Sequence, residues 1–264
     1  MQKTRIDLVM VRLGLAESRA KAQALVMAGQ VRVDGELVLK PSVMITEQAS
    51  IIIDEGEAFV SRGGIKLMAA LKAFKATVTG LVCADVGAST GGFTDCLLQN
   101  GAVRVYAIDV GYGILHWKLR QDPRVVVMER TNARYLAALP EPVALVTVDA
   151  SFISLAYLLP QIQKWFVEQP GRVIALIKPQ FEAGREQARV HAGVIKDQAV
   201  HAEVLERVLN QAQALGFTVR GLIASPIKGP KGNIEFLVAL ASGDGTGQQD
   251  LTALIEQALA GVPD

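Results

Sequence analysis

The sequence contains few of the residues from which cross-linked or metal-stabilised folds are built. Among its 264 residues are two cysteines and three histidines, and neither Cys83 nor Cys96 has a CxxC or Cys/His partner. This excludes a disulfide scaffold and a structural zinc site, and it is typical of a reducing compartment. We therefore expect a fold that depends on an apolar core, which the 50% hydrophobic content can supply.

Long hydrophobic runs and an excess of one charge are also missing. The most apolar stretch, residues 143–160, carries Asp149 in its middle, whereas a membrane span needs about 20 largely uncharged residues. Because the start of the chain is polar, we expect no signal peptide, no membrane partner and a cytoplasmic location. Lys and Arg number 27 against 26 Asp and Glu, so an acidic partner must be met by a local basic patch.

The first 58 residues differ from the rest and predict a small α+β module. Ser18 is a candidate helix N-cap and Gly29 a candidate C-cap, and Asp34-Gly35 is a typical hairpin turn. The expected elements are helices over residues 7–13 and 18–28, a hairpin over 31–38 and a strand over 50–53. The expected buried faces carry Leu8, Val9 and Val11 on the first helix and Ala20, Ala24, Leu25 and Met27 on the second.

Basic residues gather in the first two thirds of this module. Between Lys3 and Lys40, seven basic residues stand against four acidic ones. Such a patch can contact the phosphates of a nucleic acid, although a solvated helix face would carry the same charges. The candidate RNA-contacting residues are Lys3, Arg5, Arg12, Arg19, Lys21 and Arg32.

Beyond an acidic stretch at 54–57, predicted strands and helices alternate, which indicates a mostly parallel sheet with helices on both faces. The last two of seven strands have only a short Pro/Gly-rich connection, so the last strand should be antiparallel. We expect strands over 81–86, 103–109, 124–128, 143–148, 172–177, 217–224 and 234–240, and helices over 92–99, 114–120, 155–167 and 197–215. The expected domains are 1–58, a linker at 59–65, an α/β domain at 66–242, and a low-complexity stretch with a tail helix at 243–264.

A glycine-rich turn, DVGASTGGFT, follows the first strand of the α/β domain and opens a helix. Its spacing fits neither the dinucleotide GxGxxG pattern nor the phosphate-binding GxxxxGK[ST] pattern. Asp109 ends the next strand, where a carboxylate can bind both hydroxyls of a ribose. Because the turn has no phosphate-binding pattern, an adenosine that carries a sulfonium and a carboxylate fits better than a dinucleotide, and S-adenosylmethionine (SAM) is favoured over NAD. Asn132 could contact the adenine edge or cap a turn. The candidate cofactor residues are Asp85, Gly87, Ser89, Gly91, Gly92, Phe93, Asp109 and Asn132.

Four charged residues should meet at the carboxyl edge of the sheet, where ligands bind in such folds. Asp149 and Lys178 each follow a buried strand, Glu235 begins the antiparallel last strand, and Lys66 lies on the helix that enters the domain. A rim of salt bridges would look the same. However, a desolvated lysine is disfavoured as a cation and can serve as a base. The set suits removal of a hydroxyl proton during attack on a methyl sulfonium, without a metal.

Six segments carry a resemblance to a known family: SRGGIKL (61–67), DVGASTGGFTD (85–95), AIDVGYG (107–113), DASFISL (149–155), LIKPQFEAG (176–184) and SPIKGPKGNIEFL (225–237). They resemble the TlyA-type ribosomal RNA 2′-O-methyltransferases, also labelled hemolysin A, and residues 5–42 resemble an S4 RNA-binding domain. The resemblance implies an S4-like domain joined to a Rossmann-like, FtsJ-like SAM-dependent methyltransferase. It also implies that Lys66, Asp149, Lys178 and Glu235 form the family's catalytic tetrad, with Lys178 as the base, and that the substrate is cytidine in 16S or 23S ribosomal RNA.

Other functions stay open at this point. A non-catalytic S4-type RNA chaperone or ribosome assembly factor would share the basic module, but competent residue types at all four charged positions argue against it. A cytolysin would need secretion and a membrane-competent segment, and a small-molecule methyltransferase would leave the basic module unexplained. The expected partner is ribosomal RNA within a ribosomal subunit, bound by a monomer or a homodimer. We also expect His201 on a solvated helix face and Trp117 and Trp165 in the core.

Overall fold

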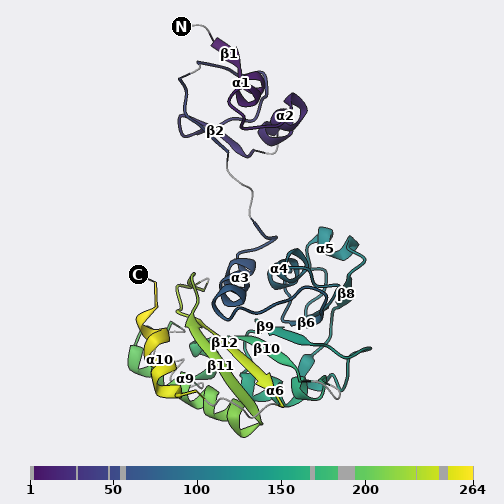
Figure 1. Cartoon of the computed structure of the whole chain (residues 1–264), viewed down its shortest axis with the longest axis vertical. Coiled ribbons are helices and arrows are strands. Elements are labelled where there is room, and N and C mark those ends of the chain that lie inside the picture. The colour runs from purple at the N-terminus through teal and green to yellow at the C-terminus, as the bar shows by residue number, and fades with distance from the viewer. Residues whose placement is uncertain are drawn as a thin grey trace. The chain divides into compact units, whose positions relative to one another are not determined.

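The chain forms two compact units, Met1–Ala58 and Phe59–Asp264. The computed structural model in Figure 1 describes residues 3–27, 29–46, 48–53, 58–166, 170–183, 194–229, 231–243 and 249–263. The expected linker at 59–65 needs correction because these residues belong to the second unit. Phe59 is buried, the N–H of Val60 donates to Asp95 (2.8 Å), and a helix already begins at Gly63. The acidic stretch at 54–57 lies outside the described residues.

The first unit contains two short helices and two small sheets. Gly29 and Gln30 donate their N–H groups back to Val26 and Leu25, which ends the second helix as predicted, and Ser18 Oγ accepts the N–H of Lys21 at its start. The strands β1 and β4 are additions that the sequence patterns do not predict. The elements are β1 (Lys3–Arg5), α1 (Ile6–Arg12), α2 (Arg19–Met27), β2 (Val31–Val33), β3 (Glu36–Leu37), β4 (Met44–Thr46) and β5 (Ile51–Ile53), with β1 paired to β4 and β2 between β3 and β5.

The buried faces of α1 and α2 differ from the prediction. Leu8 and Val11 are exposed, and so are Ala20, Ala24 and Met27 of the second helix. Val9 is buried as predicted, and the other buried positions are Ile6, Asp7, Met10, Ala22 and Val26. The cause is Asp7, a fully buried carboxylate that breaks the apolar pattern of α1. Arg5, Arg19 and Gln23 donate to its oxygens at 2.8–3.1 Å, and these bonds keep the pKa of Asp7 well below its usual range.

The second unit is built around a seven-stranded sheet with the order β11-β12-β10-β9-β6-β7-β8. The strands β8, β7, β6, β9 and β10 are parallel, and β12 is antiparallel to both β10 and β11, as predicted. The chain order reverses between β6 and β9, which is where ligands bind in open α/β sheets. The bounds are β6 (Val82–Val86), β7 (Arg104–Ile108), β8 (Val125–Met128), β9 (Leu145–Val148), β10 (Arg172–Ile177), β11 (Phe217–Ala224) and β12 (Phe236–Ser242).

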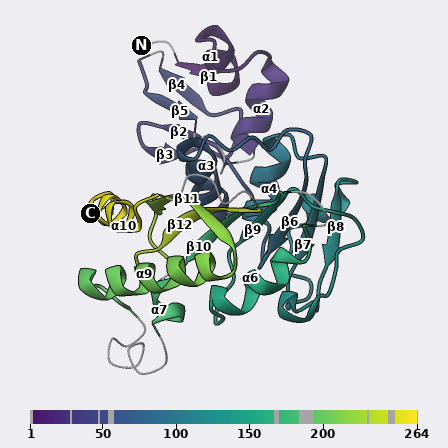
Figure 2. The same cartoon turned by 60° about the horizontal axis from the view of Figure 1, so that its bottom comes forward.

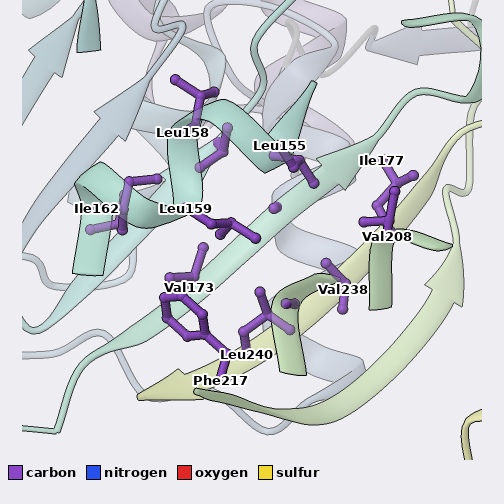
Figure 3. Packing of buried hydrophobic residues seen from close by; sticks show 14 of the residues in the cluster. Leu155, Leu158, Leu159, Ile162, Val173, Ile177, Val208, Phe217, Val238 and Leu240 are labelled. Atoms are coloured by element: carbon purple, nitrogen blue, oxygen red, sulfur yellow. The ribbon is translucent and has the colours of Figure 1, made fainter. Parts of the chain in front are cut away.

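Helices cover both faces of this sheet, as Figures 1 and 2 show. On one face pack α3 (Gly63–Ala73), α4 (Gly92–Gln99) and α5 (Trp117–Gln121); on the other pack α6 (Leu155–Gln163), α9 (Gln198–Ala214) and α10 (Leu251–Ala260). Successive strand residues alternate between the two cores. In β10, Val173 and Ile177 face the α6 side, shown in Figure 3, whereas Ile174 faces the α3 side. Each strand is therefore buried on both sides, which explains the nearly continuous apolar runs.

Several local predictions need correction. The helix expected at 114–120 begins only at Trp117, whose side chain is exposed, and α6 ends at Gln163 rather than at 167. His201 is buried rather than solvated: its Nε2 lies 3.1 Å from the carbonyl of Ile195 and its ring packs edge-on against Phe236. The tail helix is confirmed as α10, and residues 244–248 of the low-complexity stretch lie outside the described residues. Two short helices complete the unit, η1 (Ala133–Tyr135) and α7 (Pro179–Glu182).

Candidate active site

The glycine turn after β6 lies directly against the segment that follows β9. Gly87 has a φ of 81°, and a Cβ at this position would lie 2.7 Å from the carbonyl oxygen of Asp149. Only glycine fits here, because any side chain would collide with main chain that cannot move away. The N–H of Asp149 in turn donates to Val86 (2.9 Å). The predicted cofactor turn and the predicted catalytic aspartate are therefore neighbours through the backbone.

Asp109 stands at the end of β7 with its carboxylate held beside the turn. The N–H of Ser89 donates to Oδ2 (2.8 Å) and the N–H of Gly111 donates to Oδ1 (2.7 Å). A carboxylate oxygen has two lone pairs, so each oxygen can accept one further hydrogen bond. This arrangement suits a pair of neighbouring hydroxyl groups such as those of a ribose.

Asp85 lies beneath the turn and is inaccessible to solvent. The hydroxyl of Thr94 donates to Oδ2 (2.7 Å) and that of Thr147 donates to Oδ1 (3.0 Å), while burial raises the pKa of Asp85 to about 7. The carboxyl group thus ties β6 to β9 and to α4. We assign Asp85 to the support of the turn rather than to direct contact with a ligand.

Gly92 and Phe93, predicted as cofactor residues, lie in the interface between α3 and α4. A Cβ on Gly92 would come within 2.9 Å of the main-chain nitrogen of Gly64, so glycine allows the two helix starts to approach. The Phe93 ring is buried in the core on the α3 side. Both residues therefore serve packing, and their part in cofactor binding stays a prediction. Gly91, with a φ of 99°, is the N-cap of α4.

Asn132 follows β8 and takes the capping role that the sequence left as an alternative. Its Oδ1 accepts the N–H of Arg134 (3.0 Å) at the start of η1. The amide nitrogen is the group that can still donate to a ligand such as an adenine edge.

The four predicted catalytic residues form two ion pairs. Lys66 Nζ lies 2.6 Å from Glu235 Oε2, with side chains 9% and 1% exposed, and Lys178 Nζ lies 2.6 Å from Asp149 Oδ1, with side chains 10% and 21% exposed. Burial at this level means that water screens the charges poorly. The two lysines are equally buried, and the pairs differ in their carboxylates, since Asp149 is more exposed than Glu235.

Strand register brings the two pairs to the same edge of the sheet. Ile177 of β10 is the partner of Phe236 of β12, so Lys178 and Glu235 are the next residues beyond this match on neighbouring strands. The neighbouring strands β9, β10 and β12 can be followed in Figure 1. We call Lys66, Asp149, Lys178 and Glu235 the tetrad from here on.

Three residues beside Lys178 were not singled out as site residues from the sequence. Lys178 Nζ donates to Ser151 Oγ (2.9 Å), and the rings of Phe152 and Phe181 lie 4.8 Å apart. Phe152 is 89% exposed and has a φ of 64°, a conformation that strains a bulky side chain. No spacing pattern in the sequence marks these residues. The structure marks them, because an exposed aromatic ring on strained backbone at a sheet edge is typical of a functional site.

The basic residues of the first unit divide into two groups. Arg5 and Arg19 are committed to the buried carboxylate of Asp7, although both guanidinium groups remain accessible. Lys3 and Lys21, together with Arg12 and Arg32, have exposed side chains on the same unit. The structure thus gives two of the six candidate RNA contacts a structural role as well.

Two classes of site are not found among the described residues. No group of three His, Cys, Asp or Glu side chains is arranged to hold a metal ion. Within the same part of the chain, no helix is both long enough and apolar enough to cross a membrane.

The strand order, the glycine turn with its acidic partner on β7, and the charged carboxyl edge define the second unit as a Rossmann-like methyltransferase domain. A family model described as FtsJ-like methyltransferase matches residues 59–242, and one described as S4 domain matches residues 4–51. The chain belongs to the FtsJ-like methyltransferase family, in the TlyA-type group that carries an S4 domain ahead of the methyltransferase domain.

Full-length relatives support this assignment. The chain is 47% identical over 259 residues to YqxC of Bacillus subtilis strain 168, a candidate rRNA methyltransferase, covering 95% of this chain and 90% of that protein. It is 46% identical over 243 residues to TlyA of Mycobacterium tuberculosis, named a 16S/23S rRNA (cytidine-2′-O)-methyltransferase, covering 90% of each. The solved structure of a hemolysin candidate from Streptococcus thermophilus is 44% identical, with a TM-score of 0.73 and coverage of 98% and 95%.

Proposed function

We propose that this protein transfers a methyl group from SAM to the ribose 2′-hydroxyl of a cytidine in ribosomal RNA. The observation that carries the proposal is the Lys178–Asp149 ion pair of 2.6 Å, held next to a glycine turn that the backbone of Asp149 itself contacts. Asp149 thus lies between the turn and the proposed base, with its backbone against Gly87 and its carboxylate paired with Lys178. A transfer reaction requires such proximity, because the reacting groups must be positioned within a few ångströms. The name of the M. tuberculosis relative supports the choice of substrate.

The residues present fit SAM as the methyl donor. Asp109 offers two carboxylate oxygens to a ribose, Ser89 and Gly87 shape the turn, and the amide nitrogen of Asn132 can face an adenine. The turn lacks the spacing that phosphate groups need, which favours a cofactor without phosphates. When bound there, SAM would supply a methyl group on a sulfonium.

Lys178 is the proposed general base. Its neutral amine would accept the proton of the ribose hydroxyl as that oxygen takes up the methyl group. The bond from the methyl carbon to sulfur would break with its electron pair left on the departing thioether, and the proton would end on Nζ. Ser151 Oγ then accepts a hydrogen bond from the new ammonium group, as it does in the structure (2.9 Å), and the Asp149 carboxylate, 2.6 Å away, balances the ammonium charge as its ion-pair partner. These two contacts also fix the direction of the amine before reaction.

The Lys66–Glu235 pair has a different proposed role. Lys66 Nζ donates to Glu235 Oε2 (2.6 Å), and the Glu235 side chain is 1% exposed, so this pair offers substrate a less accessible carboxylate than the Lys178–Asp149 pair. As the acceptor oxygen loses its proton, negative charge grows on it, and an ammonium group fixed at the same edge stabilises that charge. Glu235 holds Lys66 in place and balances its charge in a poorly hydrated site.

A nucleotide acceptor fits the surface beside Lys178. The exposed ring of Phe152, packed against Phe181, offers an apolar face on which an unstacked base can lie. The exposed basic residues of the S4 unit offer contacts to phosphates elsewhere on the RNA. Together they favour a nucleic-acid substrate over a small molecule.

The test is to incubate the protein with tritiated SAM and separated ribosomal subunits and to map the label. We expect tritium in ribosomal RNA, at cytidines whose 3′ linkage resists alkaline hydrolysis, because a methylated 2′-oxygen cannot attack the phosphate. Absence of label together with absence of SAM affinity, even with RNA present, would contradict the proposal and favour a non-catalytic RNA-binding protein. Lysis of protein-free liposomes by the purified chain would favour a cytolysin instead.

A further inference from the structure

Two segments beyond the sheet carry the groups around the proposed base. We call residues 149–154, which follow β9, the β9 loop, and residues 178–182, which follow β10, the β10 segment. The pairing of the two strands ends at Ala175 and Val148, so no ladder hydrogen bonds hold the segments beyond that point. Beyond that point, side-chain contacts join the two segments.

Glu182 makes the contacts that join the far ends of these segments. The hydroxyl of Ser154 donates to its Oε2 (2.6 Å) and the N–H of Leu155 donates to its Oε1 (2.9 Å). From the other side, Arg207 of α9 donates to the main-chain carbonyl of Glu182 (2.7 Å), which fixes the residue against the body of the domain. The carboxylate is largely removed from solvent, and this burial raises the pKa of Glu182. Because both oxygens of this carboxylate accept hydrogen bonds, Glu182 connects the β10 segment rigidly to the end of the β9 loop.

Glu182 also contributes to capping the start of α6. Ser154 is the N-cap of α6 and accepts the N–H of Ala156, but the third residue after Ser154 is Tyr157 rather than the Glu or Gln of a capping box. Glu182 of the β10 segment, 28 residues along the chain from Ser154, brings a carboxylate to this helix start, where it accepts the N–H of Leu155 and the hydroxyl of Ser154. The start of α6, and with it the end of the β9 loop, is therefore positioned by the segment that carries Lys178.

The strained residue of the β9 loop lies between two such connections. Phe152, at a φ of 64°, is preceded by Ser151, which is bonded to Lys178, and followed by Ser154, which is bonded to Glu182. Strained backbone persists only where surrounding contacts determine it. Loss of the Glu182 contacts would release the loop and move Asp149, Ser151 and Phe152 relative to the amine.

We propose that Glu182 is a positioning residue for methyl transfer, which sets the β9 loop against Lys178 without touching the reacting atoms. The inference rests on the proposed function. Glu182 lies outside the tetrad and outside the cofactor turn, so its loss should affect the chemical step and leave cofactor binding intact. Reactions that need aligned groups lose about tenfold or more in rate from small misplacements.

The experiment compares full-length Glu182→Ala and Glu182→Gln with wild type, measuring kcat, the KM for SAM, SAM affinity by calorimetry, and Tm. We expect Glu182→Ala to lower kcat about tenfold or more with KM and affinity for SAM within about twofold of wild type. Glu182→Gln should stay within about threefold of wild type, because its amide can accept from Leu155 and donate to Ser154. Asp250→Ala is the control, since Asp250 is a carboxylate that accepts N–H groups at the start of another helix, α10; it should lower Tm and leave kcat unchanged.

Distinct results would overturn this inference. They are a kcat of Glu182→Ala within twofold of wild type, an equal loss of kcat in Asp250→Ala, or a Gln variant as slow as the Ala variant. If Glu182→Ala does not fold, Ser154→Ala removes one of the two contacts and should lower kcat about threefold; an unchanged kcat there would also contradict the proposal. Inactivity of the wild-type protein would instead count against the proposed function.

Discussion

Asp85 places a carboxyl group under the cofactor turn, where its charge state is coupled to folding. Its pKa rises from 3.8 to about 7 because the group is fully buried. Between about pH 4 and pH 7 the native protein therefore holds a proton that the unfolded chain has released. The unfolding free energy must fall as pH rises through this window, and the contribution is fully present only below pH 4.

Asp85→Asn should remove this dependence, because an amide of the same shape does not titrate. Each pKa unit corresponds to about 1.4 kcal/mol, so wild type should lose on the order of 2 kcal/mol between pH 5 and pH 8 through this group. Urea unfolding at both pH values measures the difference. If the free energy of unfolding changes by the same amount between the two pH values in wild type and variant, Asp85 is ionised in the native state at both.

Single residues differ in how far the sequence makes them predictable. The pairing of the four charged residues was predictable, because charged side chains next to apolar strands must pair or face a ligand, and the structure has two such ion pairs. Their catalytic roles stay a prediction. Ser151, Phe152 and Glu182 were not predictable, since loop residues of common types show a role only through distances. His201 was misassigned because its single hydrogen bond to a carbonyl, which makes burial tolerable, leaves no trace in sequence.

At the scale of elements, the approach of α3 to α4 positions Lys66. The first turns of the two helices meet at Gly92, where an added Cβ would lie 2.3 Å from Ser61 Oγ and 2.9 Å from the nitrogen of Gly64. The latter atom is main chain and cannot rotate away. The glycines of this segment thus serve helix packing, and through it they hold the lysine of α3 against Glu235.

Gly92→Ala should therefore destabilise the second unit by about 1–3 kcal/mol, the usual cost of overpacking. Gly63→Ala is the control, because a Cβ there would meet its nearest neighbours at 3.5 Å, an ordinary contact. Thermal unfolding compares the two variants. If Gly92→Ala melts at the same temperature as Gly63→Ala, the helices are not packed as closely as described.

Long strands and helices were predictable from pattern, and short elements were not. The seven strands of the main sheet and the helix α9 stand out because each is a buried run with turn residues on both sides. The three-residue strands β1 and β4 give no periodicity, and α1 was assigned the wrong buried face because Asp7 occupies a core position. The charge of Asp7 is compensated by hydrogen bonds from Arg5, Arg19 and Gln23, and the local sequence pattern of a helix does not reveal such contacts.

At the scale of the whole molecule, the chain joins an S4 unit to a methyltransferase unit, and the overall charge of +1 gives no general attraction to RNA. Attraction must come from local basic residues. Lys3 and Lys21 are exposed on the S4 unit. The proposed function requires that such residues contribute to affinity without taking part in chemistry.

The double variant Lys3→Ala/Lys21→Ala should bind ribosomal RNA more weakly and with a shallower dependence on salt. Each lost phosphate contact reduces the slope of log K against log salt by about 0.7–0.9. Filter binding across a salt series, with Lys72→Ala of α3 as control, measures the slopes. An unchanged slope in the double variant would remove these lysines from the RNA interface.

The most direct test of the account is the Lys178→Ala variant, assayed for folding, SAM affinity and transfer of tritium to ribosomal subunits. Lys164→Ala, which removes an exposed lysine at the C-cap of α6, is the control. We expect Lys178→Ala to fold, to bind SAM with the affinity of wild type and to leave the RNA unlabelled, while Lys164→Ala labels normally. Full labelling by a folded Lys178→Ala protein would show that another group takes the proton and would contradict the central claim.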